Sequence, residues 1–307
     1  GLNLTAGACQ NLKKFPEALA AAGESAVLLR QLVKSDSSDK RLEKELGKSI
    51  DGVGAAYKAM DKIVEARDAF REGVALSRRR VSGNPSDVLE QSALGNSLFS
   101  LGDACLSESK FEQANGEEAV KVLEESLALR RDALNRKPSD MLCRIQFKEA
   151  LLKLGDAYQA CRRFADALGR FQECSAFARE QSTKSEGWGR TLIVASNRIG
   201  SVYQAMDDPE KAIETFSGTV KLSYYLVQED SSDIQSLRYF LTSLSGISQA
   251  YLQTGKSAQA LPYLQEKKKI VMSLLEKEGK LPDLESELEW LNTKIPYIES
   301  NLPPVKK

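Results

Sequence analysis

The amino-acid sequence predicts an all-α fold, an α-solenoid of antiparallel helix pairs that ends in a C-terminal capping helix. Three observations predict it: a short motif recurs along most of the chain, acidic helix-start signals precede its copies, and helix-breaking residues are scarce. The chain has 307 residues with only 9 prolines and 20 glycines, and 7% of its residues are aromatic. That composition favours long helices over a sheet with many turns.

The recurring motif has a small residue and an aromatic residue three positions apart, then an alanine and a bulky residue four positions apart on a second helix. Three copies have identical spacing, and a fourth has serine in the glycine position. They are Gly54, Tyr57, Ala66 and Phe70; Gly155, Tyr158, Ala167 and Phe171; Gly200, Tyr203, Ala212 and Phe216; and Ser248, Tyr251, Ala260 and Leu264. Two further copies are degenerate: Ala6, Cys9, Ala18 and Ala22; and Gly102, Cys105, Ala119 and Leu123.

We call the first residue of each copy its anchor, and the anchors fall at positions 6, 54, 102, 155, 200 and 248. A repeat of about 50 residues indicates a helical solenoid, in which a small anchor lets the second helix approach closely. The alternative is an amphipathic bundle with a coincidental Gly-x-x-Tyr. Such a bundle would not keep the same gap from anchor to alanine in five of six copies.

The anchors divide the chain into repeat units that together predict one solenoid over residues 1–301. The expected units are 1–37, 38–85, 86–138, 139–184, 185–231 and 232–282, followed by a cap over 283–301 and a tail over 302–307. By comparison with the later units, the first helix of the opening unit should start before residue 1. We therefore expect the chain to be a fragment of a larger multidomain protein.

The first helix of each unit is expected to begin beside an acidic residue that caps it. Asp39, Asp87, Asp140 and Asp233 each follow a serine and precede their anchors by the same distance along the chain, and Glu186 lies one position nearer to its anchor. Ser and Asp side chains accept hydrogen bonds from the unpaired N–H groups of a helix start. Pro85 and Pro138 end the preceding helices, so helices of about 20 residues, or about 30 Å, are expected.

A further amphipathic helix follows the last unit. Leu284, Leu288 and Leu291 share one face of the segment 284–292, and Pro296 is expected to interrupt the helix. The terminal apolar face of a solenoid needs a cover with a polar outer side, which this helix supplies.

The motif resembles the tetratricopeptide repeat (TPR), whose first helix carries Leu-Gly-x-x-Tyr and whose second carries Ala-x-x-x-Phe. The family unit has about 34 residues, so the units here are longer. They look like the long-helix repeats of multidomain bacterial signalling proteins, in which segments such as Asn84 to Asp87, Leu101 to Ala104 and Ser126 to Arg131 recur. The resemblance implies a right-handed superhelix that binds partners on its concave face.

Composition narrows the function. The chain has 43 Lys and Arg, 43 Asp and Glu, and no histidine. Zero net charge argues against nucleic-acid and membrane partners, and the lack of histidine removes the commonest general base and metal ligand. Apolar runs are too short for a membrane helix, and the five cysteines lack the spacing of a disulfide framework or a zinc site. We expect a cytoplasmic protein with reduced thiols and without a cofactor or metal.

The concave face implied by the resemblance is formed by the first helices, and its side chains are polar with mixed charge. The candidate partner-binding residues are Lys48, Asp51, Lys58, Asn96, Phe99, Asp103, Leu106, Glu149, Lys153, Asp156, Gln159, Asn197, Arg198, Gln204, Gln249 and Gln253. They lack the lysine and asparagine pattern with which some TPR proteins bind a chaperone's C-terminal carboxylate. Asn197 and Arg198 could hold a carboxylate or a backbone amide. The alternative for each residue is a solvated helix face.

Other sequence features each have a functional and a structural interpretation. Residues 107–118 contain a five-residue insertion that is either a functional loop or neutral. Trp188 is either an exposed contact or part of the core, and the second is favoured. Cys9, Cys105 and Cys174 are expected to fill the core, Gly52 and Gly54 to serve helix packing rather than a dinucleotide loop, and the arginines at 78–80 and 130–131 to be solvated.

These features favour a non-catalytic scaffold that binds a peptide, a partner domain or upstream domains of its own chain. A nucleic-acid-binding helical repeat is the alternative, but the acidic residues Asp51, Asp103, Glu149 and Asp156 oppose it. A solenoid enzyme using Asp103 and Asp156 is a third hypothesis, although repeat position already accounts for both residues.

Overall fold

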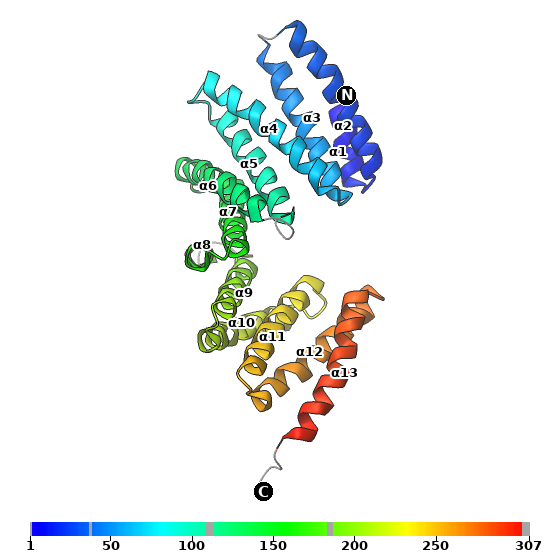
Figure 1. Cartoon of the computed structure of the whole chain (residues 1–307), viewed down its shortest axis with the longest axis vertical. Helices are drawn as coiled ribbons and strands as arrows, with labels where there is room; N and C mark the ends of the chain where they lie inside the picture. Colours follow the sequence, from blue (N-terminus) through cyan, green and yellow to red (C-terminus); the bar gives the residue numbers. More distant parts are fainter. Residues whose placement is uncertain (1, 37–38, 109–112, 183–186, 303–307) are drawn as a thin grey trace. The chain divides into compact units, whose positions relative to one another are not determined.

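The computed structural model describes residues 2–36, 39–108, 113–182 and 187–302, with the backbone alone at residues 113 and 114. Over these residues the chain forms thirteen α-helices and no strand (Figure 1). The predicted all-α class is therefore confirmed. None of the described helices is long and apolar enough to cross a lipid bilayer.

The chain divides into two compact units, residues 1–163 (unit 1) and 164–307 (unit 2). Unit 1 contains α1 (Leu2–Asn11), α2 (Phe15–Ser35), α3 (Lys40–Ala59), α4 (Ile63–Gly83), α5 (Val88–Glu108), α6 (Gln113–Arg136) and α7 (Met141–Ala160). Unit 2 contains α8 (Phe164–Ser182), α9 (Gly189–Ala205), α10 (Pro209–Glu229), α11 (Ile234–Gln253), α12 (Ser257–Glu278) and α13 (Pro282–Asn301). Within each unit, every helix packs against the next along the chain. The division between the units falls inside the predicted repeat 139–184.

Helices of the same kind also meet within each unit. The first helices α1 and α3, α5 and α7, and α9 and α11 touch one another directly. In each of these couples the two first helices lie side by side, and α1, α3, α5, α9 and α11 also pack against the second helix of their own pair. This packing is that of a helical solenoid and confirms the predicted architecture of antiparallel helix pairs.

The repeated motif forms the contact between the helices of a pair. A Cβ atom built on Gly54 would lie 2.6 Å from Cε1 of Phe70, and one built on Gly200 would lie 2.6 Å from Cζ of Phe216. Both phenylalanines are buried. Only glycine therefore permits this approach of the second helix, as the sequence predicts. The alanines of the motif are also inaccessible to solvent: Ala18, Ala66, Ala119, Ala167, Ala212 and Ala260.

The predicted helix caps are present at four starts. The side chains of Asp39, Asp87, Asp140 and Asp233 accept hydrogen bonds from backbone N–H groups two or three residues further on. Each thereby satisfies donors that a helix start leaves unpaired. Glu186, the fifth expected cap, lies outside the described residues, and α9 begins after Trp188 without a side-chain cap.

In the five helix pairs whose turns lie among the described residues, the turn has a left-handed backbone position seven residues after the anchor. The residues there have φ of +57° to +71°: Lys13, Asp61, Arg162, Asp207 and Gly255. The N–H of the next residue then donates to the carbonyl of the motif's aromatic position, as Lys62 does to Tyr57 at 2.9 Å. This is the Schellman pattern, which satisfies carbonyls at a helix end.

The capping helix lacks the predicted interruption. Pro296 was expected to interrupt it, but α13 continues through Pro296 to Asn301. Ile295 and Ile298 are buried beside it in the cluster that α12 and α13 share. Burial of these side chains offsets the single backbone hydrogen bond that a proline removes.

Most expected core positions are buried. Trp188 is 3% exposed and meets Phe177 edge to face, with ring centroids 5.5 Å apart. Cys105 and Cys174 are buried and outside any disulfide, whereas Cys9 is partly exposed. Burial raises the pKa of Cys105 to about 12, so this thiol is unreactive near neutral pH.

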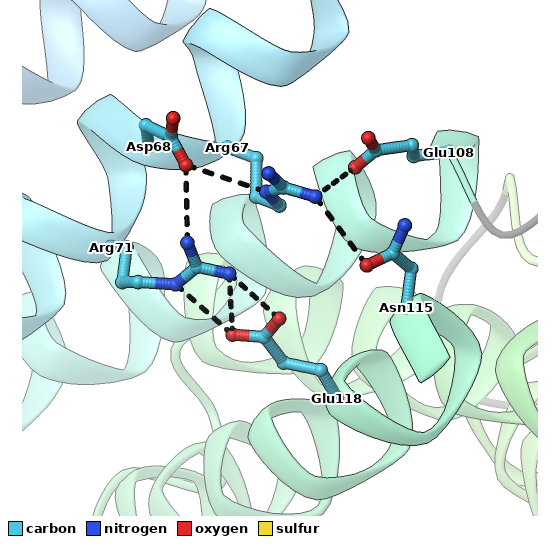
Figure 2. Close-up of polar contacts among 6 residues, drawn as sticks. All are labelled: Arg67, Asp68, Arg71, Glu108, Asn115 and Glu118. Carbon is cyan, nitrogen blue, oxygen red and sulfur yellow. Dashed lines mark hydrogen bonds and ion pairs between the residues drawn. The ribbon is translucent and has the colours of Figure 1, made fainter. Parts of the chain in front are cut away.

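Ion pairs join α4 to α5 and α6, the two helices of the following pair (Figure 2). The Arg67 guanidinium contacts Glu108 Oε2 at 2.5 Å and Asn115 Oδ1 at 3.4 Å. The Arg71 guanidinium contacts both carboxylate oxygens of Glu118. These contacts hold the two described flanks of the predicted insertion 107–118 against α4. Residues 109–112 of that insertion lie outside the described part of the chain.

Candidate functional site

An open cleft of about 1030 Å³ lies at the C-terminal ends of the first helices in unit 1. It extends from the turn after α3, across the end of α5, to Lys153 on α7. Its lining residues are Lys58, Asp61, Lys62, Ile63, Val64, Glu65, Asp103, Leu106, Ser107, Glu108 and Lys153. Three consecutive helix pairs therefore contribute to one cavity.

Two lysines share one aspartate inside this cleft. The Lys153 ammonium lies 2.6 Å from Asp103 Oδ1, and the Lys58 ammonium is ion-paired with Asp103 Oδ2. The side chains of Lys58, Asp103 and Lys153 are 35%, 16% and 29% exposed, so all three are partly shielded from water. Burial, and then the charge of Lys153, lower the pKa of Lys58. Two cations and one anion leave a local excess of one positive charge.

An apolar pocket of about 420 Å³ adjoins the lysine cleft and shares Lys58 and Asp103 with it. Ala55, Ala59, Phe70 and Phe99 line its floor. The Arg130 guanidinium lies over the Phe99 ring at 4.1 Å, a cation–π contact that holds the ring in place. The site thus combines a small apolar recess with a charged mouth.

The structure brings five predicted residues together here: Lys58, Phe99, Asp103, Leu106 and Lys153. The positions of the three charged residues relative to their anchors explain the convergence. Lys58 follows its anchor by four residues, Asp103 follows by one and Lys153 precedes by two. A step of three residues per unit is close to one helical turn, so the three side chains fall on one line across parallel helices. This regular step of three residues can be read from the sequence and indicates the site, whereas the repeated motif by itself does not.

Other predicted residues of unit 1 lie elsewhere on the first-helix face. Lys48 is exposed and pairs with Glu45 on the same helix at 2.6 Å. The Asn96 side-chain oxygen accepts hydrogen bonds from Arg130 at 3.3 Å and Gln146 at 3.2 Å. Glu149 is exposed, and Asp156 and Gln159 on α7 are partly exposed.

In unit 2 the predicted residues lie on α9 and α11. Gln204 donates to the Gln253 side chain at 3.4 Å, which links the two helices along their exposed edge. Gln249 is exposed and Arg198 is partly exposed. The described pockets do not include these side chains.

Two residues predicted to lie on the partner-binding face are enclosed between helices instead. The Asn197 amide is 6% exposed and donates to Ser243 at 3.1 Å between α9 and α11. The Asp51 carboxylate lies among α3, α4 and α5, beneath Gly73 and beside Ser97. Both side chains point between helices because residues at the edge of a helix face are covered when the neighbouring helix packs closely. The suggested pairing of Asn197 and Arg198 around a ligand carboxylate is therefore withdrawn.

Two arginines that the sequence placed on a solvated face are buried instead. Arg80 pairs with Glu90 at 2.7 Å and donates to the Glu43 carbonyl at 3.3 Å. Arg130 is 6% exposed and donates to the Gln146 carbonyl at 2.8 Å. Burial lowers the pKa of Arg130 to about 10. These arginines connect successive helix pairs, and their residue type does not distinguish them from their solvated neighbours.

In the described part of the chain, no three side chains of His, Cys, Asp or Glu lie close enough together to hold a metal ion. The cleft offers three lysine ammonium groups and four carboxylates, of which Asp103 is held by Lys58 and Lys153. Its chemistry therefore suits noncovalent recognition of polar groups.

Comparison with known proteins adds evidence on the fold. No family model and no curated protein matches the sequence. The chain is similar to the solved structure of apo RapI, with 11% identity and a TM-score of 0.63 over 93% of this chain and 68% of that one. It is also similar to NprR in complex with its cognate peptide NprX, with 10% identity and a TM-score of 0.51 over 97% and 71%.

A third similar structure links the fold to a named repeat. It is a putative kinesin light chain from Podosopora anserina with nearly identical TPR-like repeats, 18% identical over 73% of this chain and 93% of that one, with a TM-score of 0.50. At these identities the similarity concerns the fold alone. The chain therefore has a TPR-like helical-repeat fold.

Proposed function

We propose that the protein is a non-catalytic interaction scaffold that binds a peptide or a partner domain on the first-helix face of unit 1. The observation that carries the proposal is the convergence of Lys58, Asp103 and Lys153, from three successive helix pairs, on one open cleft. A cleft built across repeats is the form of site that solenoids offer to extended ligands.

Three lysines and four acidic residues line the cleft, so the excess positive charge is confined to Lys58, Asp103 and Lys153, where it favours a single acidic group on the partner. A ligand carboxylate that approached Lys58 and Lys153 would meet the excess positive charge and could share their N–H donors with Asp103. The adjoining pocket of Phe70 and Phe99 would take an apolar side chain from the same segment. The NprR structure, which contains its cognate peptide, supports peptide binding by a similar fold.

The same groups argue against catalysis and against nucleic acid. Asp103 is engaged by two lysines and is not free to accept a proton from a substrate. Asp61 and Glu65 also line the cleft, and they would repel the successive charges of a phosphate backbone, which a single acidic group does not present.

The test uses fluorescein-labelled pools of twelve-residue peptides with fixed net charge, titrated with the full chain and followed by anisotropy. We expect saturable binding of the acidic pool and a loss of at least tenfold in affinity for the double variant Lys58→Glu and Lys153→Glu. Lys48→Glu is the matched control, because Lys48 lies on α3 outside the cleft.

Three results would overturn the proposal. One is the absence of saturable binding to any pool, and another is an equal loss of affinity for the control variant. The third is tighter binding of a labelled single-stranded RNA at physiological salt, which would favour the nucleic-acid alternative.

A further inference from the structure

The side chain of Arg130 reaches from a second helix to the first-helix face of unit 1. Arg130 belongs to α6 and is only 6% exposed. Its Nη1 atom donates to the Gln146 carbonyl of α7 at 2.8 Å, and its Nη2 atom donates to the Asn96 side-chain oxygen of α5 at 3.3 Å. The Gln146 amide donates to the same Asn96 oxygen at 3.2 Å. Three helices therefore hold one guanidinium in place.

The Phe99 ring lies over this guanidinium, with 4.1 Å between the ring centroid and Cζ of Arg130. Phe99 is partly exposed and lines the apolar pocket beside the lysine cleft, together with Ala55, Ala59 and Phe70. Arg130 does not line that pocket. The ring therefore separates the buried positive charge from the pocket.

Only one helix pair has a charged residue at this repeat position. Arg130 follows the motif alanine of its pair, Ala119, by eleven residues. At the same distance the other five pairs have Leu29, Ser77, Ala178, Ser223 and Val271, of which the last four are buried. The position is therefore one that uncharged residues fill elsewhere in the chain.

An arginine at such a position is unfavourable for packing alone. A buried guanidinium loses its hydration and needs partners for all of its donors. The Nε atom of Arg130 is buried without a hydrogen-bond partner among the described residues. Burial lowers the pKa of Arg130 to about 10, so the group still carries its charge at neutral pH. The contact with Phe99 is what this arginine provides and an alanine or a serine would not.

We propose that Arg130 is a positioning residue for ligand selection, which acts through the Phe99 ring so that the pocket accepts an apolar side chain and rejects a cationic one. This role depends on the proposed function, in which an acidic group of a peptide binds Lys58 and Lys153. A cation on one face of an aromatic ring draws the π electrons towards itself, which weakens the attraction of the opposite face for a second cation. The two positive charges also repel each other at low local polarity.

An apolar side chain meets no such repulsion and would bury its surface against Phe70 and Phe99. The pocket shares Lys58 and Asp103 with the lysine cleft, so one short stretch of a ligand reaches both. The preferred peptide therefore has an acidic residue next to an apolar one.

The test uses two fluorescein-labelled twelve-residue peptides of the same composition, each with one aspartate as its only acidic residue. In the first peptide a leucine follows the aspartate and a lysine stands near the C-terminal end, and in the second the leucine and the lysine are exchanged. Both peptides are acetylated and amidated, so their net charge is the same. Anisotropy measures their affinities for the full chain.

We expect the first peptide to bind about tenfold more tightly than the second. Arg130→Met should reduce this ratio to about twofold, whereas Arg130→Lys should keep most of it, because an ammonium can also lie over the ring. Arg131→Met is the matched control, because it removes the same charge from α6 at a residue that lies over the Phe147 ring and does not line the pocket.

Equal affinity of the unaltered chain for the two peptides would overturn the role of Arg130, whether or not Arg130→Met folds. An unchanged ratio in Arg130→Met, or an equal loss in Arg131→Met, would also overturn it. If the acidic peptide pool bound but neither of these peptides did, the role would be wrong and the proposed function would stand. If neither the pool nor the peptides bound, both would be wrong.

Discussion

The Asp51 carboxylate is enclosed by three helices at the junction of two pairs. Its Oδ2 atom accepts a hydrogen bond from Ser97 at 3.3 Å, while its Oδ1 atom is buried without a hydrogen-bond partner among the described residues. Burial raises its pKa to about 6, although Ser97 and the charge of Arg80 act in the opposite direction. The folded chain therefore binds this proton more tightly than the unfolded chain does.

This carboxylate should make stability depend on pH. Because its pKa is raised from 3.8 to about 6 on folding, its contribution is present below about pH 4 and is lost as the pH rises through 6. We expect Asp51→Asn to raise the free energy of unfolding by about 1–3 kcal/mol at pH 7.5 and to change it little at pH 4. Urea denaturation at both pH values measures this, with Asp283→Asn, at an exposed position of α13, as control. An equal effect at both pH values would contradict it.

Gly200 and Gly218 form a matched pair of helical glycines in unit 2. A Cβ at Gly200 would meet the Phe216 ring, whereas Gly218 has no atom within 4 Å of its built Cβ. Gly200→Ala should destabilise the protein by about 1–2 kcal/mol through overpacking. Gly218→Ala should stabilise it by about 0.5–1 kcal/mol through helix propensity. Thermal unfolding measures the change in stability for both variants. If both substitutions changed the stability in the same direction, close packing at the anchor would be refuted.

At the scale of an element, the helix pair depends on its turn. Asp207 has φ +58°, and the N–H of Asp208 donates to the Tyr203 carbonyl at 2.9 Å. The equivalent residue of the next pair is Gly255, with φ +71°. A side chain at a left-handed position costs energy that glycine avoids.

The two turns allow a reciprocal exchange. Asp207→Gly should stabilise unit 2 by about 0.5–1 kcal/mol, and Gly255→Asp should destabilise it by a similar amount. Chemical denaturation monitored by circular dichroism measures both. If Asp207→Gly also destabilised the protein, the turn would not be limited by its backbone conformation.

The capping helix α13 covers the last apolar face of unit 2. Leu291 is fully buried in the cluster that joins α12 to α13, and the preceding Trp290 is 43% exposed. Leu291→Ala should cost about 2–4 kcal/mol because it leaves a cavity. We expect faster amide hydrogen exchange in α12 and α13 for that variant but little change for Glu289→Ala. Unchanged exchange in both variants would show that α13 is not a structural cap.

At the scale of the whole molecule, the zero net charge does not show that the charged residues have different structural roles. The chain has 43 cations and 43 anions. Some of them form ion pairs between helix pairs, as Arg67 and Arg71 do, and others, such as Arg80 and Arg130, are buried. The lysines of the cleft form a third class, since Lys58 and Lys153 share a single carboxylate. The overall charge therefore says little about where a partner would bind.

The sequence by itself determined the helix pairs, their caps and their tight contacts. These depend on short spacings along the chain, such as Asp39 to Gly54 or Gly200 to Ala212, and local hydrogen bonding and helix geometry convert such spacings directly into structure. The predicted extent of the solenoid over residues 1–301 and its parent protein remain predictions.

Only the tertiary structure decided which polar residues are accessible. Asp51 and Asn197 shared a predicted face with Lys58, but they lie between helices, and Arg80 is buried where Arg78 is exposed. Helical periodicity places a side chain to within part of a turn, whereas burial depends on the distance and tilt of the next pair. The same reason explains why the stacking of the pairs decides whether Lys58, Asp103 and Lys153 meet in one cleft, although their regular step along the repeats is visible in the sequence.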